Sequence, residues 1–249
     1  MITIKSPREI ELITKSCKIL AEVKEVLYDF VRPGVSLKEL DSIAFNEIVK
    51  RGAKPAFKGL YGFPATACIS VNEELIHGIP SDYVIKDGDI VKVDLGCNYQ
   101  GYQSDSAFTK GVGNISEDDK KIIRVAKEAF EAGLKAIKPG ARVGDVSYAI
   151  GRVIEQNNLY TPSEYCGHGI GKAVHEDPNV FNDGFPNTGP LLRDNMVICI
   201  EPMILQGSAK VRLKKNRWTV VSVEKKNAAH YEHTVLIKNG KGVVLTKGI

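Results

Sequence analysis

The segment DGDIVKVD at residues 87–94 has a counterpart in DNMVICIE at residues 194–201, and this pair decides the predicted fold. Each segment is a turn, then an apolar β-type run, then a carboxylate, Asp94 or Glu201. Pro33-Gly34 and Pro139-Gly140 repeat at a nearly equal offset, each followed by an amphipathic pattern. The resemblance of His77-Gly78-Ile79 to His168-Gly169-Ile170 completes a repeat of three parts in one order. We therefore expect one domain over residues 1–249, built from two related halves of about 1–110 and 111–249 that share one core and a cleft.

Four helices are expected from capping residues and from the helical spacing of apolar residues. Ser6 with Pro7 and Glu9 forms a capping box, and Ser36 repeats the pattern. The helices run over about 7–31, 37–51, 116–137 and 143–157. Extended runs are expected at 90–95, 107–109, 197–200, 218–223 and 234–237. Segregated helices and hairpins predict the α+β class.

Composition excludes several classes of protein. The chain has 249 residues, 43% apolar and 26% charged, with a net charge of +4, which is ordinary for a globular domain and too mild for a nucleic-acid protein. Five widely spaced cysteines, without a C-x-x-C pair, indicate reduced thiols rather than a disulfide framework or a zinc cage. The N-terminus lacks an apolar signal core and no run approaches membrane-spanning length. A soluble, cytoplasmic protein is expected.

Acidic residues close several of the predicted strands. Asp94 ends one strand, residues 98–101 are expected to turn, and the return strand carries Asp105, which can share a face with Asp94 if the register allows. The second half adds Glu201 and Glu232. Four buried carboxylates would be prohibitive unless cations neutralise them, and two divalent ions would do so. His168 offers a nitrogen ligand on a glycine-rich loop that allows close backbone approach. Such an oxygen-rich set suits Mn, Fe, Co or Zn.

The ordered set Asp94, Asp105, His168, Glu201 and Glu232, with His77 and His175, resembles the methionine aminopeptidases, most closely their short bacterial type I form, in metallopeptidase family M24. The resemblance extends from the first helix to Val235 and includes residues 72–80, 87–91, 167–171 and 200–202. It implies the pseudo-two-fold "pita-bread" creatinase/aminopeptidase fold, in which helices cover one side of a curved antiparallel sheet. It also implies an aminopeptidase that removes the N-terminal methionine of nascent proteins when the second residue is small.

The resemblance further implies a role for each site residue. Asp94 would serve one metal, Asp105 and Glu232 would bridge two, and His168 with Glu201 would complete the second. A hydroxide bridging the metals would attack the carbonyl. Glu201 would move the proton, His175 would donate to the oxyanion, and His77 would hold the scissile amide or the next residue.

An apolar pocket for the methionine side chain is expected by matched position. Its wall would consist of Phe57, Leu60, Phe63, Cys68, Val174 and Trp218. Phe57, Leu60 and Val174 differ from the residues usual in bacterial members, which leaves the second-residue preference open.

Three other functions stay open at this point: a dinuclear phosphoesterase, a metal-free binding module and a proline-directed peptidase of the same superfamily. The expected partners are nascent polypeptide N-termini, with transient ribosome contact through the basic cluster Lys214, Lys215 and Arg217, and with neither a membrane nor sequence-specific nucleic acid. A solvated surface is the stronger interpretation of such a cluster. A monomer is expected.

Overall fold

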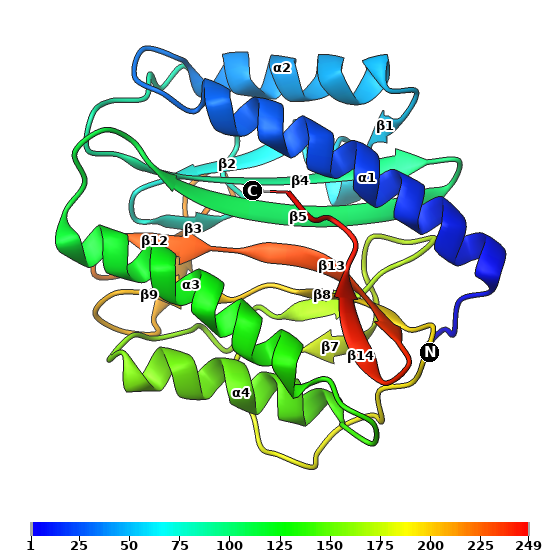
Figure 1. The fold of residues 1–249 in the computed structure, drawn as a ribbon. Coiled ribbons are helices and arrows are strands. Elements are labelled where there is room, and N and C mark those ends of the chain that lie inside the picture. The colour runs from blue at the N-terminus through cyan, green and yellow to red at the C-terminus, as the bar shows by residue number, and fades with distance from the viewer. Residues whose placement is uncertain (1, 249) are drawn as a thin grey trace.

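The computed structural model describes residues 2–248, and in it the long helices lie on one face of a curved antiparallel sheet (Figure 1). The helices are α1 (Pro7–Phe30), α2 (Leu37–Lys50), α3 (Glu117–Ala136) and α4 (Val143–Gln156), close to the predicted bounds. At the start of α1, the Ser6 hydroxyl accepts from the Glu9 N–H and the Glu9 carboxylate accepts from the Ser6 N–H. The predicted capping box is therefore confirmed at α1.

The main sheet has the strand order β1-β4-β5-β13-β8-β6-β7, with β2 paired to β4 and β14 paired to β13. Two smaller sheets, β10-β11-β3 and β12-β9, lie beside it. The strands that precede α3 are β1 (Lys54–Pro55), β2 (Ala67–Val71), β3 (Glu74–Ile76), β4 (Ile90–Tyr99) and β5 (Tyr102–Gly111). Those that follow α4 are β6 (Gly167–Gly169), β7 (Glu176–Val180), β8 (Val197–Ile200), β9 (Met203–Leu205), β10 (Val211–Leu213), β11 (Val220–Ser222), β12 (Ala228–His230), β13 (Glu232–Lys238) and β14 (Lys241–Val244).

The hairpin β4–β5 is longer than the sequence predicted. Gln100 and Gly101 form its two-residue turn with φ of 51° and 88°, which matches the type I′ turns that suit the twist of paired strands. The ladder continues from Tyr99↔Tyr102 to Ile90↔Gly111. The expected extended run at 107–109 is thus part of a ten-residue strand, because the polar residues before it also find cross-strand partners.

Two large apolar clusters form the core, and each of them packs one pair of helices against the sheet. One joins α1 and α2 to β2 and β4 through residues such as Leu20, Leu40 and Val93, and the other joins α3 and α4 to β8 and β13 through Ile122, Ile150 and others. Each amphipathic helix buries its apolar stripe against the sheet, which is the main source of its stability. The division into two related halves stays a prediction.

None of the described helices is long and apolar enough to cross a membrane.

Candidate metal centre and substrate cavity

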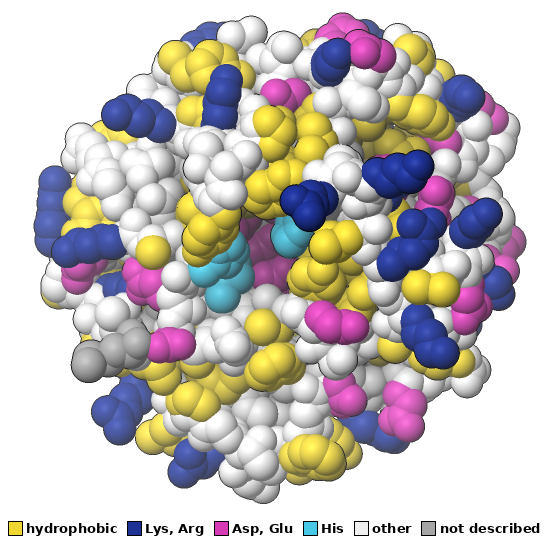
Figure 2. Space-filling view, turned by 180° about the vertical axis from the view of Figure 1, so that it is seen from behind, with side chains coloured by type: hydrophobic (Ala, Val, Ile, Leu, Met, Phe, Trp, Pro, Cys, Tyr) yellow, Lys and Arg dark blue, Asp and Glu magenta, His cyan; other side chains and the backbone are white. Residues whose placement is uncertain are grey.

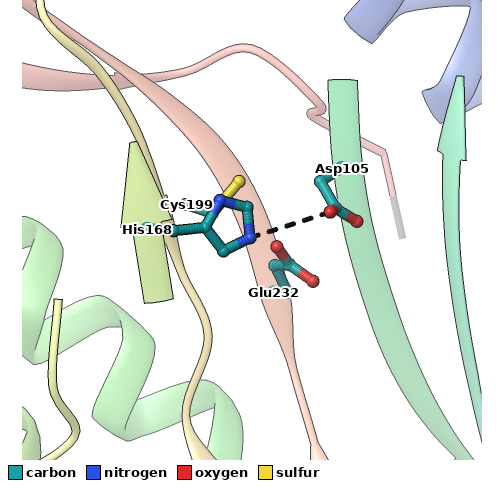
Figure 3. Close-up of side chains that lie close together, drawn as sticks. All are labelled: Asp105, His168, Cys199 and Glu232. Carbon is teal, nitrogen blue, oxygen red and sulfur yellow. Dashed lines mark ion pairs between the residues drawn. The ribbon is translucent and has the colours of Figure 1, made fainter. Parts of the chain in front are cut away.

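Five neighbouring strands each bring one of the predicted ligands to the same place. In the spatial order β4-β5-β13-β8-β6 these are Asp94, Asp105, Glu232, Glu201 (which directly follows β8) and His168. Figure 3 shows Asp105, His168 and Glu232 pointing toward one another from three different strands. Asp94 and Glu232, which are 138 positions apart in the sequence, are thereby brought to one site. The five ligands that the resemblance implied therefore form one cluster in space.

The register of the hairpin decides that Asp94 and Asp105 share a face. Asp94 is paired with Ala107, and Asp105 lies two residues before Ala107 on the same strand. Alternate side chains of a strand point to the same face, so both carboxylates project to one side of the sheet. Ala107 is in turn paired with Glu232, which aligns the third carboxylate with the first two.

His168 lies on the short strand β6, whereas a loop was expected at this position. That expectation was wrong because the flanking glycines allow the backbone to enter the sheet. A Cβ at Gly167 would lie 2.3 Å from the carbonyl oxygen of Cys199, and one at Gly169 would lie 2.1 Å from that of Asp177. The expected close backbone approach is confirmed. The His168 Nδ1 lies 2.9 Å from the carbonyl oxygen of Gly169, which leaves Nε2 as the ligand atom facing the acids.

Hydroxyl groups hold the strands at the junction of β5 and β13. Thr234 Oγ1 accepts from the Asp105 N–H at 3.1 Å and donates to the Asp105 carbonyl at 2.8 Å. Ser106 donates to the Glu232 carbonyl at 2.7 Å and itself accepts from the buried Lys24 ammonium at 2.8 Å. These side-chain bonds fix the backbone on which two of the carboxylates are mounted.

The electrostatics of the cluster call for cations. Burial raises the pKa of Asp94 to about 6 and, together with neighbouring carboxylates, raises the pKa of Asp105, Glu201 and Glu232 well above the usual range. Asp94 Oδ1, Asp105 Oδ1 and Glu232 Oε1 are buried without a hydrogen-bond partner. Buried acceptors without donors are costly, and divalent ions would satisfy them. The donor set therefore fits the predicted metal centre.

Cys199 lies against this cluster, within 4.8 Å of the donor atoms of Asp105, His168 and Glu232 (Figure 3). Burial, followed by the charge of nearby carboxylates, raises the pKa of its thiol well above the usual range. Its sulfur lies 3.7 Å from Thr234 Oγ1. Cys199 is therefore a further potential donor beside the predicted ligands, and the sequence did not predict it. The described cysteines are all free, as predicted.

His230 is a further residue beside the carboxylates and was not predicted from the sequence. Its Nε2 lies 3.4 Å from Glu201 Oε2 and 3.8 Å from Glu232 Oε2. The available signal was its position two residues before the acid that begins β13, because alternate residues of an extended chain reach the same side.

A cavity of about 700 Å³ opens beside the carboxylates. Figure 2 shows it from the face opposite the view of Figure 1, with acidic side chains at the bottom, histidines at the sides and hydrophobic side chains around the opening. All five predicted ligands line it. So do five of the six predicted pocket residues: Phe57, Leu60, Phe63, Cys68 and Trp218. Val174 packs in the same apolar cluster but is not among the described residues that line the cavity.

His77 and His175 both line the cavity beside the acids. The His175 ring meets the His168 ring edge-on, with centroids 4.5 Å apart, and stacks on Tyr61 at 5.9 Å. His77 has a left-handed backbone (φ 56°), and its ring lies edge-on to Tyr165. Burial lowers the pKa of His77 to about 4 and lowers the pKa of His175, so both rings are neutral donors near pH 7. The two tyrosines were not predicted.

Comparison with known proteins identifies the class to which this fold and site belong. Residues 11–239 match metallopeptidase family M24, and the chain belongs to that family. The predicted fold class, family and metal-dependent peptidase chemistry are confirmed.

Within that family, the chain is similar along its whole length to the methionine aminopeptidases. It is 46% identical over 247 residues to methionine aminopeptidase 1 of Bacillus subtilis, covering 99% of this chain and 100% of that protein. It is 48% identical over 246 residues to the methionine aminopeptidase of Clostridium perfringens, covering 99% of each. A crystal structure of the Thermotoga maritima methionine aminopeptidase matches with a TM-score of 0.97 at 42% identity, covering 99% of this chain and 100% of that one.

Proposed function

We propose that this protein is a methionine aminopeptidase that hydrolyses the first peptide bond of chains beginning with methionine. The observation that carries the proposal is the cavity, in which the carboxylate cluster meets an apolar wall. The similarity of the chain, over 99% of its length, to proteins named methionine aminopeptidase supports the proposal.

The proposed cofactor is a pair of divalent ions drawn from Co, Mn, Fe and Zn. Asp94 would hold one ion, Asp105 and Glu232 would bridge both, and His168 with Glu201 would hold the other. When bound, such ions polarise a carbonyl and activate water. The unpartnered buried oxygens of Asp94, Asp105 and Glu232 support this assignment, because each is an acceptor that lacks a donor.

The proposed roles of the protein groups follow from their positions. Glu201 lines the cavity and would take the proton of the attacking water and pass it to the leaving amine. His175, as a neutral imidazole, would donate to the substrate carbonyl oxygen as negative charge develops on it. His77 would position the scissile amide or the residue that follows it.

The apolar wall would select the first residue of the substrate. Phe63 and Trp218 meet edge-on with centroids 5.2 Å apart, and Phe57, Leu60 and Cys68 complete the wall. An unbranched, polarisable methionine side chain suits such a surface. The second residue would pass between the two histidines, which favours a small side chain.

The test uses Met-Ala-Ser with protein that has been reconstituted with each metal in turn, against an EDTA-treated control. We expect release of methionine only with metal, and cleavage of Met-Ala and Met-Gly peptides but not of Met-Lys peptides. Equal rates on all three would contradict the proposed second-residue selection. Phosphate esters and Xaa-Pro peptides, assayed in parallel, would separate this function from a phosphoesterase or a proline-directed peptidase.

The cellular setting is part of the same proposal: a cytoplasmic monomer acting on nascent chains, with transient ribosome contact through Lys214, Lys215 and Arg217. These side chains lie on the surface, and Lys214 pairs with Glu74. Reversing the three charges is expected to reduce co-sedimentation with ribosomes. Unchanged co-sedimentation would remove the ribosome from the proposal, and sedimentation velocity would test the monomer.

A further inference from the structure

His230 is a buried imidazole that the proposed mechanism does not use. Its exposed fraction is 1%, and neither Nδ1 nor Nε2 has a hydrogen-bond partner among the described residues. A buried polar ring with both nitrogens unpaired costs free energy, so a group that satisfies one of them is expected.

The backbone of His230 is held firmly. It ends β12, where it pairs with Met203 of β9. Thr109 of β5 bonds it from the other side, because its hydroxyl accepts from the His230 N–H at 2.9 Å and donates to the His230 carbonyl at 2.7 Å. Thr109 thus does for His230 what Thr234 does for Asp105. The position of the ring is set from two strands, as expected for a group that has to meet a ligand accurately.

Glu201 lies between two imidazoles. Its Oε1 is 3.4 Å from His168 Nε2, and its Oε2 is 3.4 Å from His230 Nε2. The donor atoms of Glu201, His230 and Glu232 all lie within 4.8 Å of one another. Atoms bound to one ion at about 2.0–2.2 Å lie roughly 3–4 Å apart, which is the spacing found between these groups.

The ring nitrogen of His230 faces carboxylate oxygens without bonding to them directly. Its Nε2 is within ion-pair distance of Glu201 and Glu232 but makes a hydrogen bond to neither. A ring nitrogen that lies 3.4 and 3.8 Å from two carboxylate oxygens, with no hydrogen bond to either, has the spacing of ligands that share a cation. His230 is also absent from the described residues that line the cavity, so it would act on the ion and leave the substrate untouched.

We propose that His230 is a sixth protein ligand of the metal centre and gives the ion at Glu201 a second imidazole beside that of His168. The inference rests on the proposed function for the existence of the centre itself. Imidazole suits Zn and Fe, whereas Mn prefers oxygen ligands. The additional nitrogen therefore biases this half of the centre toward Zn and Fe over Mn.

The first test counts imidazole ligands by X-ray absorption at the zinc edge, on metal-free protein loaded with one equivalent of Zn. Wild-type protein is expected to show two imidazoles per zinc, and His230→Gln and His230→Phe one each. His77→Asn is the matched control, because it removes a cavity histidine outside the centre and should keep the count at two. The wild-type count is decisive by itself, even if a His230 variant does not fold.

The second test measures zinc and manganese affinity by calorimetry. Zinc affinity is expected to fall at least about tenfold in the His230 variants, with a smaller loss for manganese. A count of one imidazole in wild-type protein, or equal zinc affinity in wild type and both variants, would overturn the inference, and His230 would then only position Glu201. If wild-type protein cleaves Met-Ala-Ser but shows one imidazole per zinc, the role of His230 as a ligand is overturned and the proposed function stands. A chain that neither binds zinc nor cleaves the peptide would overturn both proposals.

Discussion

Replacing Asp94 by Asn is predicted to stabilise the metal-free protein and to weaken the metal-loaded one. Burial raises the pKa of Asp94 from 3.8 to about 6, so the folded state disfavours its ionised form. A difference of about two pKa units corresponds to about 3 kcal/mol at a pH above both values. In a chain of this size, that free energy shifts the midpoint of thermal unfolding by about 6–12 °C.

The sign follows from proton linkage. Between the unfolded pKa near 4 and the folded pKa near 6, the folded wild-type protein binds the proton more tightly than the unfolded chain does. The free energy of unfolding contributed by Asp94 is therefore present below pH 4 and is lost as the pH rises to 6. Asn cannot ionise, so Asp94→Asn escapes this loss, and its advantage grows between about pH 4 and pH 6 and then levels off.

The assay is thermal unfolding by calorimetry in EDTA at several pH values, repeated with saturating metal. In EDTA at pH 8 the variant is expected to unfold at higher temperature than wild type. With metal the order should reverse, because a weaker ligand reduces the stabilisation by binding. Asp29→Asn, at an exposed carboxylate, is the matched control and should lack the pH-dependent difference. A metal-free Asp94→Asn protein that is no more stable than wild type at pH 8 would refute the reasoning.

Three further predictions follow from the same geometry. Glu201→Gln is expected to lower the turnover of Met-Ala-Ser at least about 100-fold while circular dichroism shows a folded protein, and near-normal turnover would mean that another group moves the proton. Gly96→Ala should raise the KM for methionine peptides with metal content unchanged, because its Cβ would lie 2.7 Å from the Phe57 ring and push it into the cavity; an unaltered KM would show that Phe57 can retreat elsewhere. Burial lowers the pKa of Lys92 to about 7, so the folded state binds fewer protons than the unfolded chain between pH 7 and 10.5, and the wild-type free energy of unfolding should rise across that window. Lys92→Met should flatten that rise in urea titrations, and an equal slope in both proteins would count against it.

Local signals in the sequence determined the elements. The serine caps before α1, α2 and α3 lie at the predicted positions, because a cap needs only the side chain and the first turn of its own helix. The carboxylates Asp94 and Glu201, each at the end of an apolar run, could also be identified as site candidates from the sequence, because the alternation of side chains along a strand is a local property. The resemblance then assigned the ligand set.

Only the tertiary structure decided which of these groups meet. The pairing of Asp94 with Ala107 belongs to the local hairpin β4–β5, but the pairing of Ala107 with Glu232 joins β5 to β13, two strands that are far apart in the sequence. His230 illustrates the limit, because its spacing from Glu232 is a local signal, but its approach to Glu201 exists only after β12 pairs with β9. Short-range preferences act through a few adjacent residues, whereas a metal centre is a set of distances that the packed sheet imposes on distant parts of the chain.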